Sequence, residues 1–258
     1  MMPLPKIMVA PNGAYKTKAD HPNIPVTLAE TVAAVVQAHA AGATGAHVHI
    51  RNDDQSHLLD AVQYRMLIDD ITARCPDFYV QITTEAAGKY TSQFQRDLIL
   101  DVAHPYVSAA IVELLRDCSR DDLATFYAKC TAQGIVIQHI FYSPDDMHLF
   151  YDLVRGGVIP AQQNAFLFVL GRYTTGQKSD PQDLDPFLEC LDADVVANAD
   201  WAVCAFGARE TACLVYAIER GGKARIGFEN NLLMENGEIA QSNTDRVYEL
   251  CDRLNALA

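Results

Sequence analysis

The chain has 258 residues, half of them hydrophobic, and a formal net charge of −13 at pH 7. This length can bury a full core, and because no linker or composition shift marks a boundary, we expect a single domain over residues 1–258. The negative charge argues against nucleic acid or a membrane surface as a partner, since both are polyanionic, although a local basic pocket can still bind an anionic small molecule.

The cysteines and the N-terminus bear on the compartment. Seven cysteines are scattered without a C-x-x-C pair, so we expect reduced thiols. The first residues contain several prolines and lack the basic and apolar regions of a signal peptide. No apolar run is long enough to span a membrane. These features predict a soluble, cytoplasmic protein.

Short apolar runs rich in β-branched residues alternate with helical patterns along the chain. Strands are expected at residues 7–11, 46–50, 78–83, 107–112, 135–141, 165–170, 201–206 and 224–228. Helix starts are expected where Thr27 precedes Glu30, Ser119 precedes Asp122, at Pro144, and where Ser242 precedes Asp245. Eight strand–helix repeats in about 250 residues predict an α/β fold, a (β/α)8 TIM barrel, whose chemistry lies at the carboxyl ends of the strands.

The second predicted strand carries two histidines, His47 and His49. Because side chains alternate along a strand, both imidazoles lie on one face, while Val48 and Ile50 lie on the other. An H-x-H pair alone is equally compatible with two hydrogen-bonded interior histidines.

The last predicted strand favours a metal site. Arg225, Gly227 and Glu229 would share its inward face. Inward charges are costly unless they are paired or bind something. Two histidines and one carboxylate form a catalytic type of zinc set with an open coordination position. We therefore predict that His47, His49 and Glu229 hold Zn²⁺; a structural Arg225–Glu229 pair is the alternative.

The fifth strand and one loop leave further candidates. Gln138 and His139 lie on opposite faces, and periodicity does not decide which looks inward. A lone histidine there is more often packed and hydrogen-bonded than functional. Arg172 follows the sixth strand and could meet phosphate groups, but an ordinary solvated charge is the simpler interpretation.

Several segments together resemble the β-keto acid cleavage enzyme family, from about residue 6 to residue 243. They are residues 10–14 (APNGA), His21 and Pro22 before Pro25, 41–51 (AGATGAHVHIR), 81–84 (QITT), 169–171 (VLG), 201–203 (WAV), 225–231 (RIGFENN) and 239–243 (IAQSN). The H-x-H-x-R and R-x-G-F-E segments are the specific ones.

The resemblance implies a zinc-binding barrel, assembled as a homo-oligomer (a tetramer or dimer), that converts a β-keto acid and acetyl-CoA into acetoacetate and a new acyl-CoA. It places His47, His49 and Glu229 on zinc, Arg225 beside the reacting centre and Thr83 on the substrate. Asn12, Tyr15 and Asn230 are further expected substrate contacts by position. In this chemistry zinc stabilises the enolate that forms when the methylene between the two carbonyl groups loses its proton.

The sequence departs from the family pattern where a proton must move. The family pattern has an aspartate directly after the zinc glutamate, and Asn230 cannot serve as a carboxylate base. Tyr15 replaces a glutamate in the first loop, and Glu113 replaces a threonine at the end of the fourth strand. We expect Glu113, or second Glu85, to take over the proton transfer.

Two other functions stay open at this point. A metal-dependent amidohydrolase also uses an H-x-H strand, but there the pair normally lies on the first strand, with a lysine on the fourth. A family member that has lost its base would only bind zinc or an acidic metabolite.

Overall fold

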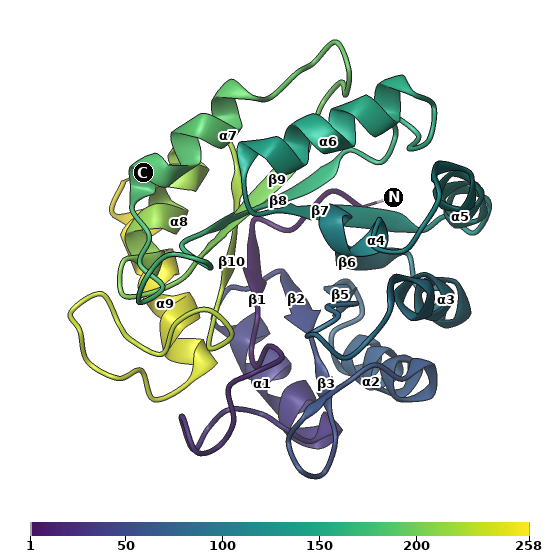
Figure 1. Cartoon of the computed structure of the whole chain (residues 1–258). Coiled ribbons are helices and arrows are strands. Elements are labelled where there is room, and N and C mark those ends of the chain that lie inside the picture. The colour runs from purple at the N-terminus through teal and green to yellow at the C-terminus, as the bar shows by residue number, and fades with distance from the viewer. Residues whose placement is uncertain (1, 258) are drawn as a thin grey trace.

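The computed structural model describes residues 2–257 and contains a closed barrel of parallel strands (Figure 1). Around the barrel the order is β1-β10-β9-β8-β7-β6-β5-β2, so each strand lies beside its neighbours in the chain. The barrel strands are β1 (Ile7–Val9), β2 (Gly45–Val48), β5 (Tyr79–Thr83), β6 (Tyr106–Ala110), β7 (Val136–Phe141), β8 (Ala165–Leu170), β9 (Asp200–Ala205) and β10 (Lys223–Ile226). The predicted (β/α)8 barrel is confirmed.

Helices surround the barrel (Figure 1). They are α1 (Leu28–Ala40), α2 (Ala61–Arg74), α3 (Ser92–Val102), α4 (Ile111–Leu114), α5 (Arg120–Ala132), α6 (Pro144–Arg155), the 3₁₀ turn η1 (Pro181–Leu184), α7 (Asp185–Glu189), α8 (Glu210–Glu219) and α9 (Asn243–Asn255). The predicted starts are present: Thr27 and Glu30 form a reciprocal capping box, and Pro144 is the first residue of α6. Within residues 2–257, none of the helices has the length and apolar character that a membrane crossing requires.

The core has two apolar parts. Outward-facing strand residues such as Val48 and Val107 belong to the large cluster between barrel and helices. A smaller cluster lies inside the barrel, and at its amino-terminal end Tyr79 and Tyr106, the first residues of β5 and β6, stack 4.1 Å apart. The same cluster extends to Val169 and Phe206 near the carboxyl ends of the strands, where polar groups join it.

Two strands end earlier than predicted because the chain leaves the barrel. Ile50 pairs with Leu58 instead, in a separate antiparallel hairpin of β3 (Ile50–Arg51) and β4 (His57–Leu58) that the sequence analysis missed. At β6 the chain turns directly into α4 at Ile111, so Glu113 lies on a short helix and not at a strand end.

The strand before Glu229 also ends early, at Ile226. Gly227 adopts φ +146°, and a Cβ at this position would collide with the carbonyl of Ala10. Glu229 therefore reaches the barrel mouth from a loop, and the alternation assumed over residues 225–229 is wrong. Its backbone N–H donates to the Ala10 carbonyl at 3.1 Å, which fixes the loop against the first strand.

Candidate active site

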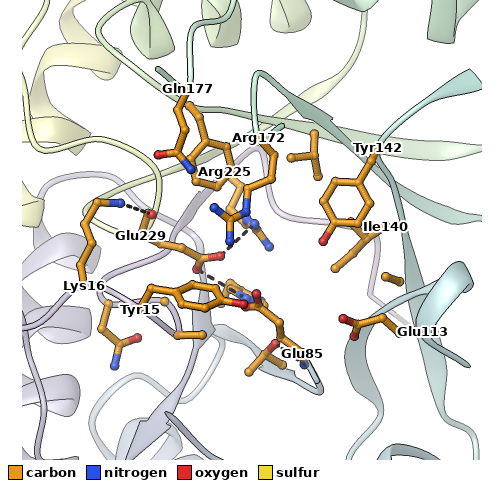
Figure 2. Close-up of a pocket in the computed structure, with 18 residues that line it drawn as sticks. Tyr15, Lys16, Glu85, Glu113, Ile140, Tyr142, Arg172, Gln177, Arg225 and Glu229 are labelled. Atoms are coloured by element: carbon orange, nitrogen blue, oxygen red, sulfur yellow. Dashed lines mark hydrogen bonds and ion pairs between the residues drawn. The ribbon is translucent and has the colours of Figure 1, made fainter. Parts of the chain in front are cut away.

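A pocket opens at the carboxyl ends of the barrel strands, and all eight strands or the loops after them contribute to it (Figure 2). Its lining comprises Asn12, Gly13, Ala14, Tyr15, Lys16, His47, Thr83, Glu85, Ala110, Glu113, Ile140, Tyr142, Val169, Arg172, Gln177, Phe206, Arg225 and Glu229. The pocket is thus where barrel folds place their chemistry.

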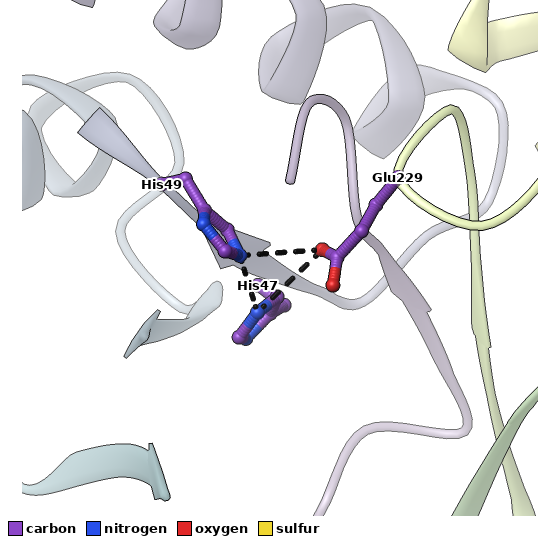
Figure 3. Close-up of side chains that lie close together, drawn as sticks. All are labelled: His47, His49 and Glu229. Carbon is purple, nitrogen blue, oxygen red and sulfur yellow. Dashed lines mark hydrogen bonds and ion pairs between the residues drawn. The ribbon is translucent and has the colours of Figure 1, made fainter. Parts of the chain in front are cut away.

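Three side chains converge at one side of this pocket: His47, His49 and Glu229 (Figure 3). The Nε2 atoms of His47 and His49 are 3.1 Å apart, and Glu229 Oε2 lies 3.6 Å from the first and 3.5 Å from the second. Both imidazoles are buried, with exposed fractions of 1% and 0%. The three ligand atoms form a small, nearly equilateral triangle.

This triangle fits a divalent cation. Ligand atoms bound at about 2.05 Å around a tetrahedral ion are separated by about 3.3 Å, close to the three distances observed. The carboxylate atom Glu229 Oε2 has no hydrogen-bond partner among the described residues although it is buried. A cation between them would satisfy this buried carboxylate oxygen, which faces two imidazole nitrogens.

Arg225 sets the electrostatics of this group. Its Nη2 atom donates to Glu229 Oε1 at 3.1 Å, and both side chains are nearly buried. Burial alone would raise the pKa of Glu229, but the guanidinium and the two histidines outweigh it and hold that pKa well below its usual range. Burial, then Arg225, lowers the pKa of His47 well below its usual value. These shifts favour Glu229 and His47 in the deprotonated forms that a metal requires.

Two more cations lie at the pocket, and the sequence analysis passed over Lys16. Lys16 Nζ donates to the backbone carbonyl of Glu229 at 2.6 Å. Burial lowers the pKa of Lys16. The Arg172 guanidinium lies 5.0 Å from the ring of Tyr15 and 5.1 Å from that of Phe206, so this residue lines the pocket and is not a solvated loop charge. The signal for Lys16 in the sequence is its place in the loop after the first strand, which does not show where its side chain points.

The two predicted carboxylates occupy the pocket wall, and Figure 2 shows Glu113 and Tyr142 across the pocket from Lys16. Glu113 Oε2 accepts hydrogen bonds from the Ala86 N–H at 3.0 Å and from Gln95 Nε2 at 2.8 Å. Burial, then the charges of Glu229 and Glu113, raises the pKa of Glu85. One carboxylate is therefore rigidly held, and the other is pushed towards protonation.

The remaining predicted contacts differ in their surroundings. Thr83 lines the pocket, and its hydroxyl accepts the N–H of Glu85 at 3.0 Å. The exposed Tyr15 also lines it. Asn12 lines it too, while its amide nitrogen donates to the carbonyl of His49 at 3.0 Å and its oxygen accepts the N–H of the same residue at 3.3 Å. Asn12 therefore anchors the backbone of a metal-site histidine.

The fifth barrel strand, β7, resolves the question that periodicity left open. Gln138 looks inward and bonds to Gln81, whereas His139 packs outward, with Nε2 2.8 Å from the Tyr127 hydroxyl. His139 is a packed, hydrogen-bonded histidine.

The sequence pattern that describes the β-keto acid cleavage enzyme matches residues 6–258. The chain belongs to this family. A relative, the 3-keto-5-aminohexanoate cleavage enzyme from Acetoanaerobium sticklandii, is 26% identical over 91% of this chain and 86% of that protein. The 3-oxoadipate:acetyl-CoA acetyltransferase of Cupriavidus necator is 24% identical over 95% of this chain and 88% of that protein.

Solved structures agree on the fold. A complex of ObcA with a C4-CoA adduct and oxalate superposes with a TM-score of 0.73 at 15% identity, over 92% of this chain. The chain spans 64% of that longer protein. At this identity the likeness establishes the barrel alone.

Asn230, an expected substrate contact, is not among the residues that line the pocket and lies against a buried acid. Its Nδ2 atom donates to Glu210 Oε1 at 3.2 Å and to the carbonyl of Arg225 at 3.3 Å. Glu210 pairs in turn with Arg246 at 2.8 Å, and both side chains are fully buried. Asn230 thus contacts structural groups behind the pocket.

Proposed function

We propose that this chain is a zinc-dependent β-keto acid cleavage enzyme that converts a β-keto acid and acetyl-CoA into acetoacetate and a new acyl-CoA. The observation that carries the proposal is the His47, His49 and Glu229 triangle in the pocket of a barrel that belongs to this family. A hydrolase or a non-catalytic binder lacks a comparable observation in its favour.

The metal site supplies the first requirement. Zinc held by the three ligands would act as a Lewis acid for the carboxylate and keto oxygens of the substrate, which stabilises the enolate. Arg225 lies beside this site, and its Nε and Nη1 atoms have no hydrogen-bond partner within residues 2–257. A fixed guanidinium there favours negative charge that develops on the keto oxygen.

Proton abstraction requires a carboxylate, and two are at hand. Glu113 is our first candidate because Ala86 and Gln95 hold one of its oxygens, which leaves the other for the pocket. Glu85 is the second, and its raised pKa brings it closer to the range in which general bases work. Thr83 lies beside Glu85 and would contact the substrate.

The carbon chemistry then follows in two balanced steps. Carbon 2 of the substrate forms a bond to the acetyl carbonyl carbon, and CoA leaves as its thiolate. The thiolate adds to the original keto carbon, the bond between carbons 2 and 3 breaks, and a proton returned to carbon 2 completes acetoacetate. Lys16 and Arg172, which both line the pocket, would stabilise the anionic thioester adduct and the departing thiolate.

The names of the relatives support the substrate class. One acts on 3-keto-5-aminohexanoate, one on 3-oxoadipate with acetyl-CoA, and a third, from Paraburkholderia graminis, on 3,5-dioxohexanoate with acetyl-CoA. The shared part of these substrates is the β-keto acid, and the tails carry an amine, a carboxylate or a ketone.

The test is an assay of acetoacetate formation over β-keto acids with cationic, anionic and neutral tails. We expect product that requires acetyl-CoA and that disappears after metal removal and in a His47→Ala, His49→Ala double variant. Consumption of a β-keto acid without acetyl-CoA, and without acetoacetate as product, would identify a hydrolase, and binding without turnover would identify a metabolite-binding protein. Light scattering of the same preparation checks the expected homo-oligomer.

A further inference from the structure

The middle of the barrel interior is unusually polar. Gln81 on β5, Ser108 on β6 and Gln138 on β7 have exposed fractions of 0%, 0% and 1%. This layer of a barrel is commonly filled by branched apolar side chains, and a buried amide costs free energy unless every polar atom is bonded. The proposed metal site does not by itself require glutamines here.

The two glutamines form one continuous chain of hydrogen bonds with His47, and Ser108 Oγ lies beside this chain, at the longer distance of 3.5 Å from His47 Nδ1. His47 Nδ1 is 2.9 Å from Gln81 Oε1, Gln81 Nε2 donates to Gln138 Oε1 at 2.9 Å, and Gln138 Nε2 donates to the carbonyl of Phe166 at 2.9 Å. The chain crosses the barrel from β2 to β8 and ends on backbone.

The final carbonyl fixes the direction of every bond. A backbone carbonyl can only accept, so the amide nitrogen of Gln138 must face Phe166, and its oxygen must face Gln81. Gln81 then donates to Gln138 and turns its own oxygen to His47. An oxygen acceptor at 2.9 Å requires that His47 carry its proton on Nδ1, which leaves the lone pair on Nε2.

That lone pair is aimed at the proposed metal site. His47 Nε2 is the atom 3.1 Å from His49 Nε2 and 3.6 Å from Glu229 Oε2. We propose that Gln138 and Gln81 are positioning residues. Because the Phe166 carbonyl fixes the direction of both amides, they hold His47 in the tautomer whose Nε2 can bind a metal. This inference rests on the proposed metal site, because the tautomer matters only if Nε2 is a ligand.

The test measures Zn²⁺ affinity of the metal-free protein by competition with a chelator. Replacing Gln81 with Leu should weaken binding about 10- to 100-fold, the scale of partners behind a metal ligand. Gln138→Leu should weaken it in the same direction, because Gln81 is then free to turn. Gln163→Leu is the matched control: Gln163 is also buried but bonds to the backbone of Ile135 and Ile137, outside the chain of bonds.

A second measurement determines the tautomer of His47 in the wild-type protein, so it does not depend on whether the glutamine variants fold. Ring ¹⁵N resonances of the metal-free wild-type protein, assigned to His47 by comparison with His47→Ala, should show the proton on Nδ1. A proton on Nε2 would overturn the inference, as would equal losses of affinity in all three leucine variants. If the wild-type protein binds no Zn²⁺, the proposed metal site fails, and the His47 resonances still decide the tautomer.

Discussion

Two carboxylates, Glu113 and Glu85, are candidates for the group that accepts the substrate proton. Geometry favours Glu113, and the raised pKa favours Glu85. Glu113 is held by two donors, and the pKa of Glu85 is raised by burial. We expect Glu113→Gln to keep its metal and fold but to lose at least ~100-fold in turnover, the scale of a general base. Steady-state kinetics of Glu113→Gln beside Glu85→Gln decide between them. If both variants stay fully active, neither carboxylate takes the proton.

The raised pKa of Glu85 also predicts a pH dependence of stability. A carboxyl group whose folded pKa lies above its unfolded pKa destabilises the folded state once pH exceeds the unfolded pKa, because ionisation is then easier in the unfolded chain. In the metal-free protein, Glu85→Gln should therefore raise the melting temperature at pH 8 and leave it nearly unchanged at pH 4. Equal effects at both pH values would contradict the shift.

Arg225 is expected to serve both the reaction and its metal ligand. Arg225→Met should lower turnover about 100-fold, the scale of a lost electrostatic donor. It should also destabilise the metal-free protein, because Glu229 loses its buried partner at 3.1 Å. Zn²⁺ should restore most of the melting temperature by taking over that compensation. A stability loss that Zn²⁺ does not reduce, with normal turnover, would make Arg225 purely structural.

At the residue level, the sequence predicted that His47, His49 and Glu229 lie together, because the two histidines are two positions apart on and just after a strand. It failed for Lys16 and for the glutamines Gln81 and Gln138. A loop lysine has no periodicity that shows where it points, and a strand glutamine reads as an ordinary polar residue. Their partners become visible once eight strands are closed into one barrel.

Among the elements, the loop after β10 gives Asn230, directly after Glu229, a structural partner. Asn230 donates to the buried carboxylate of Glu210, so an aspartate there would bring two carboxylates together. We expect the wild type to have the highest melting temperature, Asn230→Ala a lower one and Asn230→Asp the lowest. Leaving a buried polar group unsatisfied lowers the free energy of unfolding by about 1–3 kcal/mol. Asn230→Asp should not increase turnover. A stable Asn230→Asp variant with higher turnover would show that the family's aspartate can work here.

Apolar runs and helix-cap residues were enough to predict which segments form strands and in which order. They did not predict where each strand ends. Periodicity carried the predicted strands past Val48, Ala110 and Ile226, where the chain leaves for a hairpin, a helix and a glycine turn. These exits depend on tertiary contacts, such as the clash of any side chain at Gly227 with Ala10. In a barrel the strand ends carry the site, so this error matters most there.

For the whole molecule, an acidic chain of net charge −13 places Lys16, Arg172 and Arg225 at one pocket, together with the carboxylates of Glu85, Glu113 and Glu229. A divalent cation at the proposed metal site would tip this balance to net positive, which would favour an anionic keto acid and the thioester of an anionic cofactor. The association should weaken with salt, because screening acts on this attraction.

The path of the acetyl carbons tests the central claim most directly. When acetyl-CoA labelled with ¹³C in both acetyl carbons is incubated with the metal-loaded protein and an active β-keto acid, we predict label in carbons 3 and 4 of acetoacetate and an unlabelled acyl-CoA. Carbon NMR reads both products. Unlabelled acetoacetate, or label in the new acyl-CoA, would contradict a β-keto acid cleavage reaction at this site.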